Sequence, residues 1–187
     1  MRLNVIIAST RPGRVGLPVG RWAFEAAKAH GGFDVHLADL AEFALPLYDE
    51  PRHPRLRQYE HAHTRRWSES VDAADAFVLV TPEYNHAPTP SLLNAFDYVL
   101  HEWAYKPAAF VSYGGISGGL RAVQATKPVL AGIKVMPIPE AVVINMPAEQ
   151  VRDGVFHPKD VQVAAAGTML DELQRWAEAL APLRRKG

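Results

Sequence analysis

Short apolar runs, each about the length of one β-strand, recur along this chain and alternate with segments of helical spacing. Residues 3–8 and 76–80 are the clearest runs, because they are apolar almost throughout and end in polar or glycine-containing segments. Strands that are apolar on both faces are typical of parallel sheets covered by helices on both sides. Further strands are expected at 33–37, 108–113 and within 135–145.

Apolar residues at helical spacing connect these strands. The segments expected to be helical are 15–30, 56–74, 89–103, 120–130 and 157–180. Pro137 and Pro139 interrupt the last strand, which predicts an edge position or a bulge. With right-handed crossovers, this alternation predicts one three-layer α/β/α domain over residues 1–187, with a five-stranded parallel sheet. We favour the flavodoxin-like strand order 2-1-3-4-5 over a Rossmann half.

Composition excludes several classes of function. The 187 residues carry 20 basic and 20 acidic side chains, so no basic surface for nucleic acid is expected. The absence of cysteine excludes a disulfide framework, a thiolate metal site and a cysteine nucleophile. Apolar runs are strand-sized, and the N-terminus is too briefly apolar for a signal peptide. We therefore expect a cytoplasmic protein that binds neither nucleic acid nor membrane.

The loop after the first strand has the character of an anion site. Ligands of such sheets bind at the carboxyl ends of the strands, and a helix N-terminus offers free N–H groups to an anion. The loop contains neither G-x-G-x-x-G nor a Walker motif, so a terminal phosphate fits it better than a pyrophosphate. An ordinary turn with two solvated arginines is the alternative. The residues expected to contact the phosphate are Ser9, Thr10, Arg11, Gly13, Arg14, Val15 and Gly16.

Two more loops, at the ends of the third and fourth strands, are expected to enclose a flat ring. Pro82 fixes φ and turns the chain, which should leave the backbone N–H groups of Tyr84 and Asn85 free for a ligand. The second loop has four glycines in residues 114–119, so its backbone is open to close approach. The residues expected to contact the ring are Pro82, Glu83, Tyr84, Asn85, Ser112, Tyr113, Gly114, Gly115, Ser117 and Gly118.

Together these motifs resemble the NAD(P)H-dependent FMN reductase family, flavodoxin-like flavoproteins that include quinone, azo-dye and chromate reductases. Residues 82–85, Pro-Glu-Tyr-Asn, match the family's most characteristic tetrapeptide. Residues 9–14 resemble its phosphate loop, and 112–119 its third flavin loop. The resemblance covers residues 3–145, and it departs at Ala8, where many members have glycine. Many members also have a serine at the position of residue 15 or 16.

The resemblance implies the cofactors and the reaction. FMN would place its phosphate in the first loop and its ring between the other two, with NADPH or NADH as hydride donor. The electrons would pass to a small acceptor, such as a flavin, quinone, azo compound or metal oxyanion, in a ping-pong cycle. No catalytic side chain and no metal is required. The resemblance also implies a homodimer or homotetramer, with residues 91–103 and the loop near Tyr48 as candidate interface elements.

Two other functions stay open on the sequence. Residues 115–119 read G-x-S-x-G, and Asp153 and His157 follow, which is the pattern of a serine hydrolase that uses Ser117. The other is a non-catalytic FMN electron carrier, although a neutral chain lacks the acidic docking surface expected of one.

Two clusters of basic residues are interpreted as surface rather than site. The histidines at 53, 61 and 63 are expected to be solvated rather than metal-bound. Arg65 and Arg66 are expected on a solvated helix face rather than at the 2′-phosphate of NADPH.

Overall fold

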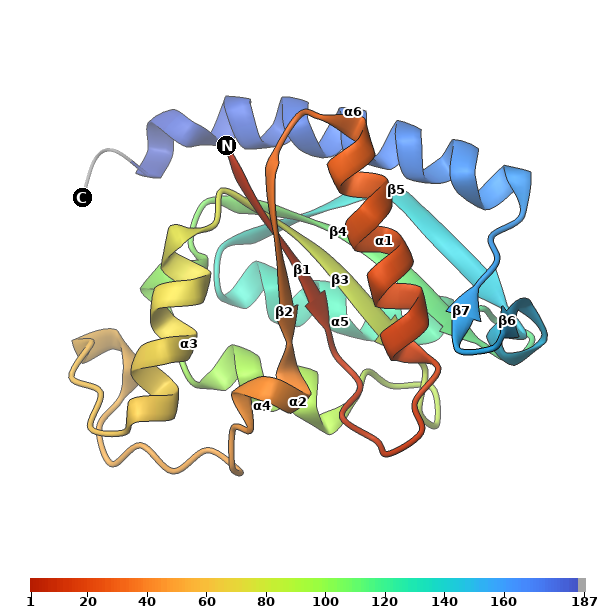
Figure 1. Ribbon diagram of the computed structural model, residues 1–187. Coiled ribbons are helices and arrows are strands. Elements are labelled where there is room, and N and C mark those ends of the chain that lie inside the picture. The colour runs from red at the N-terminus through yellow and green to blue at the C-terminus, as the bar shows by residue number, and fades with distance from the viewer. Residues whose placement is uncertain (185–187) are drawn as a thin grey trace.

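The computed structural model describes residues 1–184 and has a parallel sheet at its centre (Figure 1). The strands run in the order β2–β1–β3–β4–β5, as the sequence predicts for a flavodoxin-like fold. Their bounds are β1 Arg2–Ile7, β2 Asp34–Asp39, β3 Ala76–Pro82, β4 Lys106–Gly114 and β5 Val135–Asn145. Every residue of β3 is buried, in line with its continuous apolar run. The expected fold class and strand order are therefore confirmed.

Helices cover both faces of the sheet, which produces the three expected layers (Figure 1). One buried cluster packs α1 and α6 on one face, and a second packs α2, α3, α4 and α5 on the other. The second cluster holds the large aromatic side chains of Trp67, Trp103, Phe77 and Phe96, all at most 1 % exposed. The helices are α1 Gly16–His30, α2 Leu40–Phe43, α3 Ala62–Ala73, α4 Pro90–Asp97, α5 Leu120–Gly132 and α6 Asp160–Arg184.

Three helix boundaries differ from those expected. Helix α3 begins at Ala62 rather than at residue 56, because a 3₁₀ turn over Pro54–Leu56 ends at Arg57 in the left-handed conformation. Helix α4 stops at Asp97, and a separate 3₁₀ turn, His101–Trp103, completes the predicted helical stretch. Helix α6 begins at Asp160, three residues after the expected start. The apolar spacing therefore predicts which segments contain a helix, but not where each helix begins or ends.

The fifth strand lies at the edge of the sheet, where its prolines are tolerated. Its register against β4 shifts between Ala108 and Phe110, which is the bulge that the prolines predict. A short hairpin of β6, Val151–Arg152, and β7, Val155–Phe156, then precedes α6. Among residues 1–184, no helix combines the length and the apolar character needed to cross a membrane.

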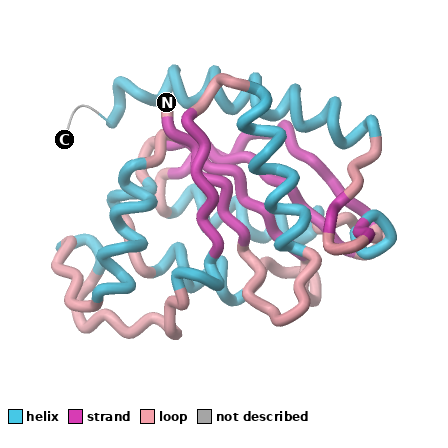
Figure 2. Tube along the Cα trace, in the orientation of Figure 1, coloured by secondary structure: helices cyan, strands magenta, loops and turns pink. Residues whose placement is uncertain are grey.

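The parallel register brings the carboxyl ends of four strands together at one end of the sheet. Ile7 of β1 pairs with Val80 of β3, and Pro82 of β3 pairs with Tyr113 of β4. Gly114 in turn pairs with Asn145 of β5. The loops that follow these residues therefore gather at the same end of the sheet, as the trace in Figure 2 shows for the loop between β1 and α1.

Candidate functional site

A cavity of about 400 Å³ opens at the carboxyl ends of these strands, and residues at or just after the ends of all four line it. Most of its lining comes from the three predicted loops. Residues 146–149 are an addition that sequence reasoning missed, because they have no motif and only their place after a strand end could have indicated them. The cavity is lined by Ser9, Arg11, Arg14, Val15, Pro82, Glu83, Tyr84, Tyr113, Gly114, Gly115, Met146, Pro147, Ala148 and Glu149.

Seven of the predicted residues lie near the cavity without lining it. Thr10 instead lines a separate hollow of about 300 Å³ beside Leu45 and Asn94. The other six are Gly13, Gly16, Asn85, Ser112, Ser117 and Gly118.

The first loop is shaped by a tight turn that leads into α1. The N–H of Arg14 donates to the carbonyl of Arg11 at 3.1 Å, and Gly13 has a φ of 68°. Proline followed by glycine at positive φ is the pattern of a type II turn. In the described structure, no side chain caps the N-terminus of α1, and its first turn contains no acidic residue. The N–H groups of that turn are therefore available to an anion.

The two arginines of this loop differ in their electrostatic role. The Arg14 guanidinium pairs with the carboxylate of Asp39, which is 4 % exposed and also accepts the N–H of Ala41 at 3.0 Å. Arg11 is exposed and forms no ion pair within residues 1–184. The charge of Arg14 is thus largely offset by the protein, while that of Arg11 is available to a ligand.

Unpartnered polar atoms gather beside this loop. The Tyr113 hydroxyl and Arg14 Nε are buried, and neither has a hydrogen-bond partner within the described chain. A Cβ on Gly16 would lie 2.2 Å from Tyr113 Oη, so this hydroxyl lies against the first turn of α1. Burial raises the pKa of Tyr113, which keeps the hydroxyl protonated as a donor. Because buried donors are rarely left unpaired, this arrangement fits a ligand rich in oxygen acceptors, as a phosphorylated flavin is.

The loop after β3 folds into a tight turn that changes one prediction. Tyr84 N–H donates to the carbonyl of Ala87 at 2.9 Å, and the N–H of Ala87 returns the bond at 3.0 Å. Asn85 and His86 have φ values of 49° and 66°, which is the pattern of a type I′ turn. The prediction that the Tyr84 N–H is free was therefore wrong. The Tyr84 hydroxyl instead lies 3.0 Å from Ser9 Oγ, which links this loop to the first one.

The loop after β4 depends on its glycines. Gly119 has a φ of 90°, and a Cβ there would lie 2.8 Å from the backbone nitrogen of Tyr113. Ser117 donates to Glu83 Oε2 at 2.6 Å and has no hydrogen bond to a histidine within residues 1–184. Asp153 lies in the turn between β6 and β7. The hydrogen bonds of Ser117 therefore do not form the triad that a serine hydrolase needs.

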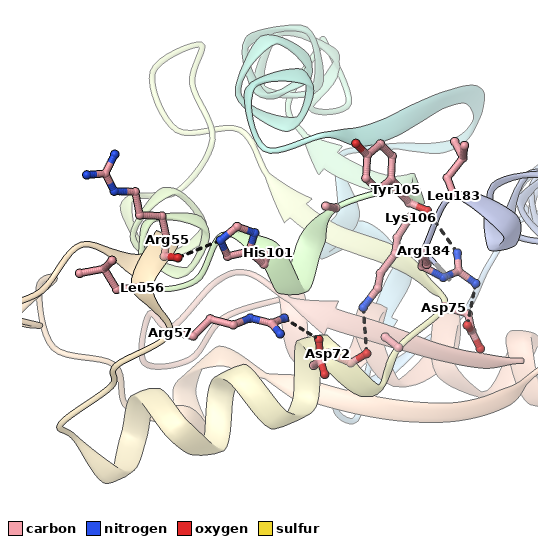
Figure 3. A pocket seen from close by; sticks show the side chains of 12 residues that line it. Arg55, Leu56, Arg57, Asp72, Asp75, His101, Tyr105, Lys106, Leu183 and Arg184 are labelled. Atoms are coloured by element: carbon pink, nitrogen blue, oxygen red, sulfur yellow. Dashed lines mark hydrogen bonds and ion pairs between the residues drawn. The ribbon is translucent and has the colours of Figure 1, made fainter. Parts of the chain in front are cut away.

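A larger cavity of about 850 Å³ lies at the opposite, amino-terminal edge of the sheet (Figure 3). Two of its arginines pair with carboxylates: Arg57 with Asp72 at 3.0 Å, and Arg184 with Asp75 at 2.8 Å. Lys106 Nζ donates to two carbonyls at the end of α3, at 2.8 and 2.9 Å. Figure 3 shows these side chains turned toward one another. No residue lining this cavity has a buried polar atom without a partner in the described structure, so it lacks the mark of a ligand site.

The basic residues on and before α3 also have protein partners. His61 and His63 stack at 5.1 Å, and His63 Nε2 lies 3.1 Å from Asp49 Oδ1. Among residues 1–184, no group of three potential metal ligands is arranged to hold an ion. Arg65 and Arg66 donate to backbone carbonyls, which agrees with a surface role.

Comparison with known proteins gives one consistent family. The model of the NADPH-dependent FMN reductase family matches residues 1–149. An NAD(P)H-dependent FMN reductase of Schizosaccharomyces pombe is 35% identical over 159 residues, which are 84% of this chain and 79% of the relative. An NADPH azoreductase of a Bacillus species is 36% identical over 124 residues, or 65% of this chain and 66% of the relative.

A solved structure shows the same fold. The flavoenzyme NAD(P)H:(acceptor) oxidoreductase FerB of Paracoccus denitrificans superposes with a TM-score of 0.75 at 22% identity. The match covers 95% of this chain and 97% of that one.

Proposed function

The chain belongs to the NADPH-dependent FMN reductase family, and on that premise we propose that it passes electrons from NAD(P)H through FMN to a small acceptor in a ping-pong cycle. Membership makes it an oxidoreductase with FMN as cofactor and NAD(P)H as donor. The observation that carries the assignment of the site is the unpartnered Tyr113 hydroxyl beside the uncapped first turn of α1.

We propose that the phosphate binds at residues 9–16. The N–H groups of the first turn of α1 and the Ser9 hydroxyl would donate to it, and Arg11 would supply the positive charge. The Tyr113 hydroxyl would donate to an oxygen of the cofactor beside this turn. Pro82, Glu83 and Tyr84 would bound the ring on one side, and the Tyr113–Gly115 backbone on the other. When bound, FMN accepts a hydride from a reduced nicotinamide and returns the electrons to an acceptor.

We propose that donor and acceptor use the same exposed face of the bound ring in turn. The oxidised donor then leaves before the acceptor enters, which is the ping-pong order. The cavity itself has a volume of about 400 Å³, at the low end for a small-molecule site. The Bacillus relative is named an azoreductase. We therefore propose acceptors of the same general kind: a flavin, a quinone, an azo compound or a metal oxyanion.

We also propose that the protein is a homodimer or homotetramer that acts in the cytoplasm. The loop before α3 supports the assembly, because Leu47 is 87% exposed there. The neighbouring residue Tyr48 donates its N–H to Asn94 of α4 at 2.8 Å, so loop and helix form one surface. Sedimentation at micromolar concentration tests this assembly, and a monomer would refute it.

The reaction is tested by spectroscopy without oxygen. Purified protein reconstituted with FMN should show flavin absorption that bleaches on addition of NADPH or NADH, and the colour should return when a quinone is added. Steady-state rates with varied donor and acceptor should give parallel double-reciprocal lines. Protein that holds FMN but does not oxidise either nicotinamide would be a carrier, and intersecting lines would exclude the ping-pong cycle.

A further inference from the structure

Glu83 has an unusual set of partners for a residue at the end of a strand. Its side chain is 6 % exposed, and both carboxylate oxygens accept hydrogen bonds from the segment that follows β4. Oε2 accepts the Ser117 hydroxyl at 2.6 Å and the Arg121 N–H at 3.1 Å. Oε1 lies 2.5 Å from the Arg121 guanidinium. Burial alone raises the pKa of Glu83, yet these donors bring it below its ordinary value.

The same carboxylate completes the N-terminus of α5. Gly119 is the N-cap and has no side chain, and the first turn of α5 contains no acidic residue. Glu83 reaches this end from another strand and accepts an N–H that the helix leaves without a partner. Its negative charge also lies at the positive end of the helix dipole. This interaction is therefore a cap supplied from outside the helix.

The backbone of Glu83 holds the other side of the glycine loop. Its N–H donates to the carbonyl of Tyr113 at 3.1 Å, so Glu83 contacts the loop before Gly114 and again at Ser117. The tip of that loop has little packing of its own, because Ile116 is 98% exposed. Asn145 provides the other support by donating to the carbonyl of Ile116 at 2.6 Å. A chain rich in glycine has many conformations to lose, and Glu83 restricts them.

Arg121 extends these contacts to the loop after β3. Its guanidinium donates to His86 Nε2 at 2.7 Å, and His86 lies in the type I′ turn that also contains Tyr84. One arginine thus contacts the strand end through Glu83 and the turn through His86. The loop after β3 and the loop after β4, here called the two ring loops, are therefore both joined to the first turn of α5.

We propose that Glu83, Ser117 and Arg121 form a loop lock, which holds the two ring loops in their binding conformation before the flavin arrives. Glu83 and Arg121 act as positioning residues in this assignment, since they set the place of the loop backbone that faces the cavity. This proposal rests on the proposed function only in naming FMN as the ligand. The contacts among Glu83, Ser117 and Arg121 are present without it.

The test compares the apoprotein with its variants in two measurements. FMN affinity is read from quenching of flavin fluorescence, and backbone order at residues 113–119 is read from amide hydrogen exchange. Arg121→Ala should weaken FMN binding about tenfold and speed exchange in these residues. Arg121→Lys should restore part of the affinity, because an ammonium group still pairs with Glu83. Arg57→Ala is the matched control, since Arg57 and Arg121 are both 48% exposed and both pair with a carboxylate.

A double-mutant cycle separates a lock from independent contacts. In the Glu83→Gln background, Arg121→Ala should weaken FMN binding less than it does in the wild type, because its ion pair with Glu83 is already weakened and mainly its contact with His86 is left to lose. Additive losses would overturn the proposal, and so would unchanged exchange at residues 113–119 in Glu83→Gln. If wild-type apoprotein binds no FMN, the proposed function fails, whereas the exchange measurement still decides the lock.

Discussion

Glu83 and Glu102 are buried glutamates at opposite edges of the same sheet, and their immediate partners are closely alike. Glu102 accepts the hydroxyls of Ser68 and Tyr59, each at 2.8 Å, and lies 3.5 Å from Arg57. Glu83 also accepts a serine hydroxyl and pairs with an arginine, but it uses both oxygens, whereas Glu102 Oε2 is buried without a partner in the described chain. The two side chains are 2 % and 6 % exposed.

The difference lies in what each carboxylate joins. Glu102 connects α3 to the 3₁₀ turn beside Trp103, in the densest aromatic part of the core. Glu83 connects a strand end to a loop of glycines beside a cavity with unpartnered polar atoms. The same ionic group therefore stabilises the fold where its neighbours are rigid, and shapes a binding site where they are not. Cavity size does not reveal this difference, because the larger cavity lies on the side of Glu102.

Glu102→Ala should give the largest loss of stability and leave FMN binding intact. The change leaves the partly buried hydroxyls of Tyr59 and Ser68 without their acceptor, and we expect the free energy of unfolding to fall by about 3 kcal/mol. Urea unfolding followed by tryptophan fluorescence measures it. Arg57→Ala is the comparison variant: it removes the cation beside Glu102 but keeps both hydroxyl partners, so it should lower stability by less, about 1 kcal/mol, because Arg57 is half exposed and 3.5 Å away. A Glu102→Ala protein that is folded but unable to bind FMN would contradict a purely structural role for Glu102.

Lys106 should make the free energy of unfolding depend on pH. Burial lowers its pKa to about 8, whereas an unfolded lysine has a pKa of 10.5. Between these two pKa values Lys106 is protonated in the unfolded state and largely neutral in the folded state. The free energy of unfolding therefore rises with pH, by about 2 kcal/mol between pH 8 and about pH 9.5. Chemical unfolding across this range should show the rise in the wild type and not in Lys106→Met. Parallel curves for the two proteins would exclude Lys106 as the cause.

Gly16→Ala should weaken FMN binding by about tenfold, or about 1.4 kcal/mol. The added methyl would lie 2.2 Å from Tyr113 Oη, so the hydroxyl must leave its place beside the first turn of α1. Gly20 provides the matched control in the same helix, since a methyl there would meet Ile7 of the core at 2.4 Å. Gly20→Ala should therefore lower the thermal midpoint with little change in affinity. Equal affinities for Gly16→Ala and the wild type would count against a role for Tyr113.

Arg11→Gln should produce the smallest effect, about threefold weaker FMN binding, because an exposed charge is screened by salt. The loss should shrink as the salt concentration increases. Arg14→Gln is the contrasting variant: it leaves buried Asp39 without its partner, so it should lower stability as well. FMN titrations at two salt concentrations check this, and a salt-independent loss in Arg11→Gln would indicate a different role for Arg11.

The sequence was sufficient for the architecture because strand burial and helix spacing are local signals. The positions of the strands, the prolines that mark β5 as an edge strand and the Thr89 cap of α4, where Oγ1 accepts the N–H of Leu92, follow from residue types at short range. The strand order does not: it comes from favouring the flavodoxin-like arrangement for this alternation of strands and helices. The start of α3 does not, because its preceding N–H groups bind Glu50 in another segment. The spacing of apolar residues cannot reveal that a distant carboxylate binds these N–H groups in place of a helix carbonyl.

The candidate site could be predicted as a set of loops but not as a set of contacts. Arg14 has its partner at Asp39, and Glu83 has its partners at Ser117 and Arg121, all far along the chain. Tyr84 uses its N–H inside a turn. Such pairings depend on strand register, which sets loops side by side without leaving a local pattern. The same limit explains why the segment after β5 was missed.

FMN titration of the apoprotein, with Glu83→Gln and Arg57→Ala measured beside the wild type, is the most direct test of where the flavin binds. We expect wild type and Arg57→Ala to bind FMN with the same affinity, and Glu83→Gln to bind it about tenfold more weakly. Equal affinities in all three proteins, or a loss confined to Arg57→Ala, would contradict this expectation.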